Sequence, residues 1–406
     1  MDETRLQGLR DEVLDWRHKG VPDSAHGRTI AEWTASGAPV SALPTPSVTL
    51  SEQALAHNLG AMAAWCAERG LALAPHGKAT MAPQLWRRQL EAGAAGITVA
   101  TPFQAGVARH FGVPRILIAN QIADPAAVAR LSAWAAEGTA IGLFSDSEAT
   151  VDLLSAAATT TVDVLVELGA DGGRAGARSI EAALAVAARV AAAPNLRLAG
   201  VAGYEGAVTA GTDAAALAAV DDYLGDLATL FAALDFETDR PVVTAGGSAY
   251  FDRVAAVLGP LAGTAEVLLR SGSYLVHDHG CYARWTPAAR GGDGPGLRPA
   301  LTARSRVLSR PEPGLAILDA GRRDLPFDQD LPVPLGLGDA PGRGPAHCPQ
   351  ISDQHLFLKG APDRLAVGDV VELGLSHPCT SFDKWRLIPV VDEATGLVVD
   401  AVRTFF

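Results

Sequence analysis

A lysine follows the first apolar segment in the α/β-patterned part of this chain. Residues 71–74 predict a short buried strand, and Pro75-His76-Gly77-Lys78 come directly after it. Among apolar walls, the loss of hydration lowers the pKa of a lysine amine and leaves it neutral and nucleophilic. Lys78, with His76 beside it, therefore suits a lysine that forms a Schiff base with an aldehyde. The alternative is an ordinary solvent-exposed lysine on a loop.

Two loops of small residues follow later apolar segments. Thr244-Ala-Gly246-Gly247-Ser248 ends the run at 241–244, and Arg270-Ser-Gly272-Ser273 follows residues 266–269. Glycine lets backbone N–H groups approach an anion, and serine and threonine add hydroxyl donors. We therefore expect a phosphate group to bind to Thr244, Gly246, Gly247, Gly272 and Ser273. A nucleophilic lysine with two phosphate loops indicates a cofactor that carries an aldehyde at one end and a phosphate at the other.

Two further side chains stand after predicted strands. Arg174 lies on the glycine turn Asp171-Gly-Gly-Arg174, and Tyr204 opens the motif Tyr204-Glu205-Gly206. Arg174 is a candidate to face a ring nitrogen of the cofactor, and Tyr204 is a candidate to stack on that ring or to bind its phosphate. The alternative for Arg174 is the exposed position that arginine usually takes.

A histidine and a cysteine stand two residues apart near the end of the chain, in Ser376-His377-Pro378-Cys379. In a strand, residues i and i+2 face the same side, so the imidazole and the thiolate can converge on one ion. Both suit Zn²⁺, with Mn²⁺ as a further possibility, and two protein ligands leave positions for water and substrate. The alternative is an ordinary strand end.

Other motifs compete for the same chemistry. His277-Asp278-His279 and His347-Cys348 both contain metal-binding residue types. Adjacent residues point apart, which disfavours His347-Cys348, and we expect the histidines of the other motif to make hydrogen bonds near the phosphate. Trp385 and Arg386 either line the same cavity or pack inside their domain.

These residues need a scaffold, and the hydrophobic pattern indicates one. Eight short apolar runs, each followed by a helical stretch rich in Ala and Leu, lie at residues 71–74, 96–99, 115–118, 139–143, 162–166, 197–201, 241–244 and 266–269. Runs of this length suit strands that are buried on both faces. Eight β/α units predict an α/β fold with a (β/α)₈ TIM-like barrel, whose active site lies at the carboxyl ends of its strands. An open parallel sheet is the competing architecture.

The pattern changes after the Gly-rich connector at 291–296. Beyond it, alternating segments without intervening helices predict a β-domain, at 301–309, 315–319, 355–358, 370–375, 387–391 and 398–404. We therefore expect an N-terminal extension at 1–45, with one helix at 6–16, that packs on the rest, a barrel at 46–290 and a β-domain with the metal pair at 291–406. The Pro/Gly-rich segment 327–350 predicts a lid, an interface loop or a solvent-facing insertion.

Composition limits the class of partner. The net charge is -12 and no cluster of Lys and Arg is present, so a nucleic acid or an anionic membrane surface is disfavoured as partner. The N-terminal residues lack the pattern of a secretory signal, and no apolar run reaches the length of a membrane span. We expect a cytoplasmic enzyme with a small-molecule substrate, and its four scattered cysteines should be thiols.

Five motifs together resemble a known family: Pro75-His-Gly-Lys-Ala-Thr80, Gln89-Leu-Glu-Ala-Gly-Ala94, Ile116-Leu-Ile-Ala-Asn120, Tyr204-Glu-Gly206 and Ser376-His-Pro-Cys379. From about residue 45 to the end, the chain is similar to the D-serine dehydratase and D-threonine aldolase family of alanine-racemase-like, fold-type III enzymes.

The resemblance implies several properties of the chain. It implies a pyridoxal 5'-phosphate barrel with a C-terminal β-domain, a head-to-tail homodimer and attachment of the cofactor to Lys78. It also implies that Arg174 lies near the pyridine nitrogen and that Gly246, Gly247 and the Gly272-Ser273 turn contact the phosphate. Many members carry Thr-His-Lys directly after the lysine, where this chain has Ala79-Thr80-Met81, so a role for that histidine has no counterpart here.

Four functions follow from these expectations. The favoured one is the dehydration and deamination of D-serine, D-threonine or 3-hydroxy-D-aspartate to a 2-oxo acid and ammonia, because the dehydratase branch carries His-x-Cys where the aldolase branch carries His-x-Asp. The second is retro-aldol cleavage to glycine and an aldehyde. Racemisation needs a second acid/base, for which no tyrosine is securely placed. A non-catalytic carrier of the cofactor would not need the β-domain with His377 and Cys379.

Overall fold

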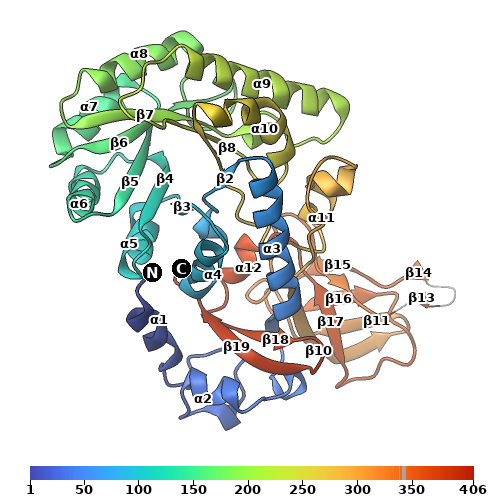
Figure 1. Cartoon of the computed structure of the whole chain (residues 1–406). Coiled ribbons are helices and arrows are strands. Elements are labelled where there is room, and N and C mark those ends of the chain that lie inside the picture. Colours follow the sequence, from blue (N-terminus) through green and yellow to red (C-terminus); the bar gives the residue numbers. More distant parts are fainter. Residues whose placement is uncertain (338, 341–343) are drawn as a thin grey trace.

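Eight short parallel strands form the barrel that the sequence predicts (Figure 1). The computed structural model describes residues 1–337, 339–340 and 344–406, and it pairs the strands in the order β2-β9-β8-β7-β6-β5-β4-β3. Their bounds are β2 (Ala72–Leu73), β3 (Ile97–Val99), β4 (Arg115–Gln121), β5 (Ala140–Ser145), β6 (Val162–Leu168), β7 (Leu196–Gly203), β8 (Val242–Ala245) and β9 (Glu266–Leu269). The N–H of Thr98 donates to the carbonyl of Pro75 (3.0 Å) just beyond β2, so the first and last strands of this order also meet.

Helices cover the outside of the barrel. They are α3 (Glu52–Glu68), α4 (Pro83–Glu91), α5 (Pro102–His110), α6 (Pro125–Ala136), α7 (Glu148–Ala157), α8 (Ile180–Ala191), α9 (Ala214–Ala232) and α10 (Phe251–Leu258). Six of them begin at a side chain that accepts a backbone N–H of the first turn, namely Ser51, Thr101, Asp124, Ser147, Ser179 and Asp213. Such caps satisfy N–H groups that would otherwise lack partners, and they fix where each helix starts after its strand. Among the described residues, no helix has both the length and the apolar character that crossing a membrane requires.

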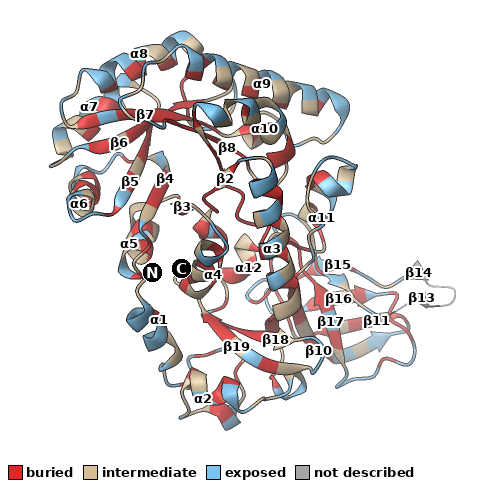
Figure 2. Ribbon diagram, viewed as in Figure 1, coloured by how far each residue is buried: buried red, intermediate tan, exposed pale blue. Residues whose placement is uncertain are grey.

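The barrel strands are buried on both faces, which explains their continuous apolar runs (Figure 2). Alternate residues belong to two different clusters. Leu117, Phe144, Leu165 and Leu268 pack together, while their sequence neighbours, such as Ile116 and Ile118, pack with the helices. The first cluster is the filling of the barrel, as expected for a packed core rather than a pore.

The C-terminal part of the chain forms a sheet of mostly antiparallel strands. Its path runs β15-β16-β11-β10-β1-β18-β19, and β17 pairs with β10 and β12 beside it. The strands are β1 (Ser47–Ser51), β10 (Leu301–Glu312), β11 (Leu315–Leu318), β12 (Val333–Pro334), β15 (His347–Ile351), β16 (Leu356–Lys359), β17 (Val370–Gly374), β18 (Leu387–Asp392) and β19 (Leu397–Arg403). Two short helices, α11 (Cys281–Trp285) and α12 (Cys379–Phe382), lie where this sheet meets the barrel (Figure 1).

The boundary predicted at residue 46 is wrong by one strand. β1 pairs with β10 and β18 in the C-terminal sheet, so the β-domain begins before the barrel and is completed after it. No strand was predicted at residues 47–51, and a local apolar pattern would not show to which sheet β1 belongs, because β1 precedes a helix as a barrel strand does.

The N-terminal extension packs on the β-domain. The helix predicted at 6–16 is shorter, α1 (Glu3–Arg10), and Val13 beyond it forms a bridge with Thr29 just before α2 (Ile30–Ala35). Leu14 and Trp33 bury their side chains against β18 and β19, and the contact anchors the first 45 residues to the β-domain.

The segment 327–350 is not a structureless loop. Among its described residues are β12, the two-residue strands β13 (Asp339–Ala340) and β14 (Gly344–Pro345), and most of β15. The residues of this segment that precede β12 contact residues 376–380, because Asp328 and Asp330 form hydrogen bonds with side chains there.

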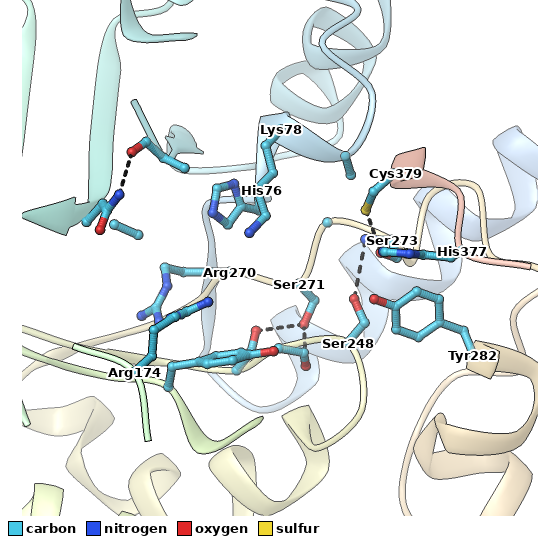
Figure 3. Close-up of a pocket in the computed structure, with 18 of the residues that line it drawn as sticks. His76, Lys78, Arg174, Ser248, Arg270, Ser271, Ser273, Tyr282, His377 and Cys379 are labelled. Atoms are coloured by element: carbon cyan, nitrogen blue, oxygen red, sulfur yellow. Dashed lines mark hydrogen bonds between the residues drawn. The ribbon is translucent and has the colours of Figure 1, made fainter. Parts of the chain in front are cut away.

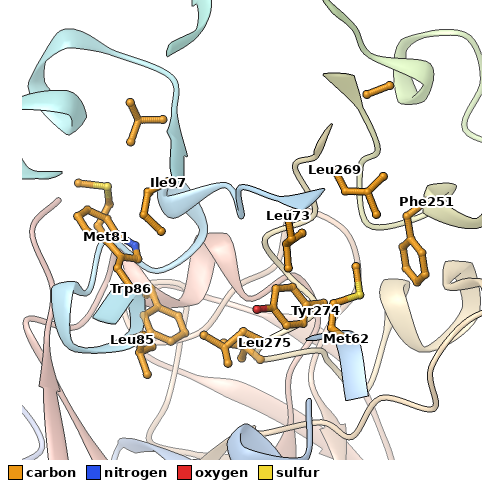
Figure 4. Packing of buried hydrophobic residues seen from close by; sticks show 14 of the residues in the cluster. Met62, Leu73, Met81, Leu85, Trp86, Ile97, Phe251, Leu269, Tyr274 and Leu275 are labelled. Atoms are coloured by element: carbon orange, nitrogen blue, oxygen red, sulfur yellow. The ribbon is translucent and has the colours of Figure 1, made fainter. Parts of the chain in front are cut away.

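The turn that carries Lys78 rests on a tightly packed core. Gly77 begins the 3-10 turn η3 (Gly77–Ala79), and a Cβ at this position would lie 2.8 Å from Cγ2 of Ile97 and 3.0 Å from the Trp86 ring. Figure 4 shows Met81, Trp86 and Ile97 grouped together in this core. Only glycine fits here, so the packing fixes the direction in which the next residue leaves the backbone.

Candidate active site

A cavity of about 290 Å³ opens at the carboxyl ends of the barrel strands (Figure 3). Each barrel strand or the loop that follows it contributes to the wall of the cavity. The lining residues are His76, Lys78, Ala79, Ala100, Ala119, Asn120, Phe144, Glu167, Arg174, Tyr204, Gly246, Gly247, Ser248, Arg270, Ser271, Gly272, Ser273, Tyr282, His377 and Cys379. The last two come from the β-domain, so neither domain completes the cavity alone.

Lys78 projects from η3 into this space. Its side chain is open to the cavity, yet protein atoms surround it on most sides, so it is both reachable by a ligand and partly stripped of water. Burial lowers the pKa of the amine, the thiol of Cys379 opposes that shift, and Arg174 and Arg270 reinforce it. A lysine with a lowered pKa supplies the neutral amine that nucleophilic attack requires.

Two arginines stand across the cavity from Lys78. Arg174 stacks over the ring of Tyr204, with its Cζ 4.7 Å from the ring centroid. Arg270 is almost fully buried and donates to the carbonyl of Gly203 (2.6 Å) and to Oγ1 of Thr244 (2.7 Å). Thr244, predicted to bind the cofactor, is fully buried behind the wall and also donates to the carbonyl of Leu268. It acts on the cavity through Arg270 and not by direct contact.

The two small-residue loops lie side by side, but their N–H groups have different partners. The carboxylate of Glu205, which is completely buried, accepts from the N–H of Gly246 (2.9 Å) and of Gly247 (2.5 Å). Gly246 and Gly247 line the cavity, but their N–H groups already donate to Glu205. By contrast, the N–H groups of Ser248 and Gly272 have no hydrogen-bond partner among the described residues. An anion at this end of the cavity would therefore meet the N–H groups of Ser248 and Gly272 first.

Serine hydroxyls tie the two loops together. Oγ of Ser271 donates to the carbonyls of Gly246 (3.0 Å) and Gly247 (3.1 Å), and the N–H of Ser273 donates to Oγ of Ser248 (3.3 Å). The loop after β9 also runs close to the turn after β2, because a Cβ at Gly272 would lie 2.5 Å from the carbonyl oxygen of His76. The loop geometry that the sequence predicts is thus present, with its glycines needed for close approach.

His377 and Cys379 both reach the cavity, but not along a strand as predicted. β17 ends at Gly374, His377 has a left-handed backbone (φ 57°), and Cys379 begins α12. A sharp turn, rather than the alternation of a strand, brings the two side chains to the same side. Sγ of Cys379 lies 3.8 Å from Oγ of Ser273, and both residues line the cavity.

The imidazole of His377 lies between one carboxylate and one phenol ring. Its Nδ1 lies 2.5 Å from Oδ2 of Asp328, and its ring centroid lies 6.4 Å from that of Tyr282. Burial lowers the pKa of the imidazole, but the Cys379 thiol and the Asp328 carboxylate outweigh it and raise the pKa to about 9. Both His377 and Cys379 line the cavity. No group of three or more candidate metal ligands is present within the described residues.

The competing motifs do not line the cavity, and the expectation that His277 and His279 form hydrogen bonds near the phosphate is wrong: Nδ1 of each is buried without a hydrogen-bond partner among the described residues. Asp278 is buried and accepts from the N–H groups of His377 and Gly280 (both 2.9 Å), so it supports the turn that carries His377. His347 and Cys348 lie on β15 in the β-domain, one exposed and the other buried. Trp385 is buried and donates from Nε1 to the carbonyl of Asp324 (2.8 Å), which identifies it as β-domain packing.

Among the lining residues that were not predicted are Asn120, Glu167, Arg270 and Tyr282. Arg270 follows β9, and Asn120 lies near the end of β4. The rule that barrel active sites form at the carboxyl ends of strands, which identified Lys78, could therefore have identified both. Glu167 lies inside the apolar run of β6, where an isolated carboxyl is itself a signal. Tyr282 comes from α11 outside the strand pattern, and nothing local marks it. Burial raises the pKa of its phenol, which therefore stays protonated and can donate.

Comparison with known proteins places this geometry in a family. The model for the alanine racemase N-terminal domain matches residues 50–274, and that for the "Putative serine dehydratase domain" matches residues 300–391. A D-threonine aldolase from Arthrobacter sp. is 31% identical over 90% of this chain and 93% of its own, and a 3-hydroxy-D-aspartate aldolase from Paracoccus denitrificans is 26% identical over 85% and 88%. The crystal structure of D-threonine aldolase from Filomicrobium marinum superimposes with a TM-score of 0.79 at 29% identity, over 91% of this chain and 97% of that one.

We predict that Glu205→Ala destabilises the protein by about 1–3 kcal/mol, because two buried N–H groups lose their acceptor. Glu205→Gln keeps one acceptor oxygen and should lose less. Chemical denaturation measures both, with the exposed Glu91→Ala as the control that should stay close to wild type. Equal stability of Glu205→Ala and wild type would contradict the structural role of this carboxylate.

The buried carboxyl of Glu167 should make stability depend on pH. Burial raises its pKa above the ordinary 4.5, although a hydrogen bond from Gln121 and the charges of Arg270 and Arg174 lower it. The folded state therefore holds this proton more tightly than the unfolded state, and the contribution to stability is complete below pH 4.5 and is lost as pH rises through the folded pKa.

Glu167→Gln removes this dependence. Relative to wild type, the variant should be most stable near pH 8 and should lose that advantage below about pH 4.5. Denaturation curves from pH 4 to 8 test this, and exposed Glu91→Gln serves as control. A difference from wild type that is the same at every pH would exclude a raised pKa at Glu167.

Proposed function

The chain belongs to the alanine-racemase-like family of pyridoxal-phosphate enzymes, and from this premise we propose that it is a lyase acting on D-configured β-hydroxy amino acids. The observation that supports this proposal most directly is the convergence of Lys78 with His377 and Cys379 in one cavity. An amine that can hold an aldehyde cofactor stands beside two donors of the kind that bind a divalent cation. The relatives named D-threonine aldolase and 3-hydroxy-D-aspartate aldolase act on substrates of this class.

The residues present fit pyridoxal phosphate. Lys78 offers its amine at one end, and the free N–H groups of Ser248 and Gly272 with the hydroxyl of Ser273 offer anion donors at another. The buried Nδ1 of His76 has no partner within the described residues, so a polar group in the cavity would satisfy it. When bound, this cofactor supplies the electron sink that stabilises a carbanion at the substrate Cα.

Lys78 and the two arginines have different roles in this proposal. Lys78 holds the cofactor, and once its amine is free it removes the proton from Cα of the substrate. The lowered pKa of that amine keeps it able to accept a proton near neutral pH. Arg174, stacked on Tyr204, and Arg270, fixed by Gly203 and Thr244, supply the cationic side of the cavity and orient the bound ring.

The residues also fit a divalent cation. Asp328 occupies Nδ1 of His377, so Nε2 is the ring nitrogen left for a metal, and Cys379 lines the same cavity. Nitrogen and sulfur donors suit Zn²⁺, and a pair of protein ligands leaves open positions for water and substrate. A cation held there would supply the Lewis acidity that the departure of hydroxide needs.

Among lyase reactions, we propose elimination of water followed by deamination to a 2-oxo acid and ammonia. Retro-aldol cleavage needs a base for the β-hydroxyl proton, and the position that carries histidine in many relatives is Thr80 here, a buried residue outside the cavity. The dehydratase branch carries a cysteine at the position of Cys379, where the aldolase branch carries an aspartate, so Cys379 also favours elimination. The second candidate, cleavage to glycine and an aldehyde, is favoured by the names of the curated relatives.

We predict that borohydride reduction of the holoenzyme fixes the cofactor to Lys78 alone. The chain has only four lysines, Lys19, Lys78, Lys359 and Lys384, so peptide mapping gives an unambiguous answer. Lys384→Arg should label as wild type does, and Lys78→Ala should not label. Label on another lysine would refute the assignment of the site.

Product analysis distinguishes the two reactions. A panel of D-β-hydroxy amino acids should yield a 2-oxo acid and ammonia, and chelation or Cys379→Ala should lower this activity at least ~100-fold while the cofactor spectrum persists, because leaving-group stabilisation of several kcal/mol is lost. Cys348→Ala, a buried cysteine outside the cavity, is the matched control. Glycine and an aldehyde as products would establish the second candidate, and full activity of metal-free enzyme would exclude the role given to His377 and Cys379.

A further inference from the structure

The ring of His377 is held from outside the cavity by a single carboxylate. Oδ2 of Asp328 lies 2.5 Å from Nδ1 of His377, and Oδ1 of Asp328 accepts from the hydroxyl of Thr380 at 2.6 Å. Both oxygens of the carboxylate are therefore engaged, which fixes its plane and with it the direction of the imidazole. Asp328 does not line the cavity, so it acts on the site only through His377.

This contact selects the form of the imidazole. An ionised carboxylate only accepts hydrogen bonds, so Nδ1 must carry the proton that it shares with Asp328. In the neutral ring the lone pair is then on Nε2, the nitrogen left for a ligand. Hydrogen bonds of this type set the tautomer and orientation of metal-bound histidines and strengthen them as ligands.

Two other aspartates support the turn around His377 but form no hydrogen bond with its ring. Asp278 accepts from the N–H of His377 (2.9 Å), and Asp330 accepts from Oγ of Ser376 (2.9 Å) and pairs with Arg284 (2.9 Å). The turn also has to sustain the left-handed backbone of His377, which is unfavourable for a residue with a side chain. Asp278 and Asp330 therefore fix the position of the turn, and Asp328 fixes the direction of the imidazole.

We propose that Asp328, in the segment between β11 and β12, is a positioning residue that presents Nε2 of His377 to a divalent cation shared with Cys379. The inference rests on the proposed metal-dependent function and adds to it a residue remote in sequence from the metal pair. The proposal also assigns a role at the site to the segment that begins at residue 327.

The test is the affinity for Zn²⁺, measured by competition with a chromogenic chelator on the holoenzyme. Asp328→Ala should bind Zn²⁺ about 10- to 100-fold more weakly than wild type, the range typical when such a hydrogen bond to a ligand is removed. Asp328→Asn keeps an oxygen that accepts from Nδ1 but loses the charge, so it should recover part of the affinity. The cofactor spectrum and the labelling of Lys78 should be unchanged in both variants.

Two controls make the result specific. Asp383→Ala removes a half-exposed aspartate that pairs with Lys384 at the end of α12 and does not touch His377, so its affinity for Zn²⁺ should equal that of wild type. His377→Ala should lose the ion almost completely. The absorption spectrum of Co²⁺-loaded protein adds a readout of ligand geometry, and it should change in Asp328→Ala but not in Asp383→Ala.

The outcomes separate this inference from the proposed function. If His377→Ala loses Zn²⁺ while Asp328→Ala and Asp328→Asn bind it like wild type, the positioning role is overturned and the metal site stands. If His377→Ala also binds normally, the metal site itself fails. If Asp328→Ala does not fold, Asp328→Asn decides, since it is isosteric: wild-type affinity and an unchanged Co²⁺ spectrum in that variant would overturn the proposal.

Discussion

The buried carboxylate of Glu205 is the contact on which the rest of the cavity depends. A charge with no exposure to water must find hydrogen-bond donors, and Glu205 finds them in the adjacent N–H groups of Gly246 and Gly247. This bond joins the loop after β7 to the loop after β8. The carbonyls of the same two glycines accept from Ser271, so the constraint passes on to the loop after β9. Three loops thus behave as one rigid wall, which is how a binding site on loops can be precise.

The same wall sets the electrostatics of the site. Tyr204 precedes Glu205 directly, and its ring lies under Arg174, while the charge of Glu205 helps to offset the burial of Arg270. Opposite this wall, the packed turn at Gly77 directs Lys78 into the cavity, and the β-domain supplies His377 and Cys379. Cationic and nucleophilic groups therefore surround a space of about 290 Å³.

Much of this arrangement could be predicted from the sequence, and the failures have physical causes. The barrel strands were readable because strands buried on both faces are continuous apolar runs, and Lys78 followed from the rule that barrel sites form at strand ends. The partner of Glu205, the support that Thr244 gives to Arg270 and the approach of Tyr282 are contacts between distant segments, which no local pattern encodes. The turn at His377 was missed because its left-handed backbone occurs at a residue other than glycine.

The position of β1 has a consequence for the order in which the chain acquires its structure. Its neighbours in the sheet are β10, with Thr49 and Thr302 in contact across 253 residues, and β18, which is farther along still. On the ribosome, β1 leaves the exit tunnel before the whole barrel and must wait, unpaired, for both partners. Closing so long a loop costs chain entropy, and the barrel, complete by β9, reduces that cost when it folds first and brings its two ends together. The barrel thereby serves as the template on which the split β-domain is assembled, and a barrel cut free at residue 290 would keep β1 as an exposed, unsatisfied strand.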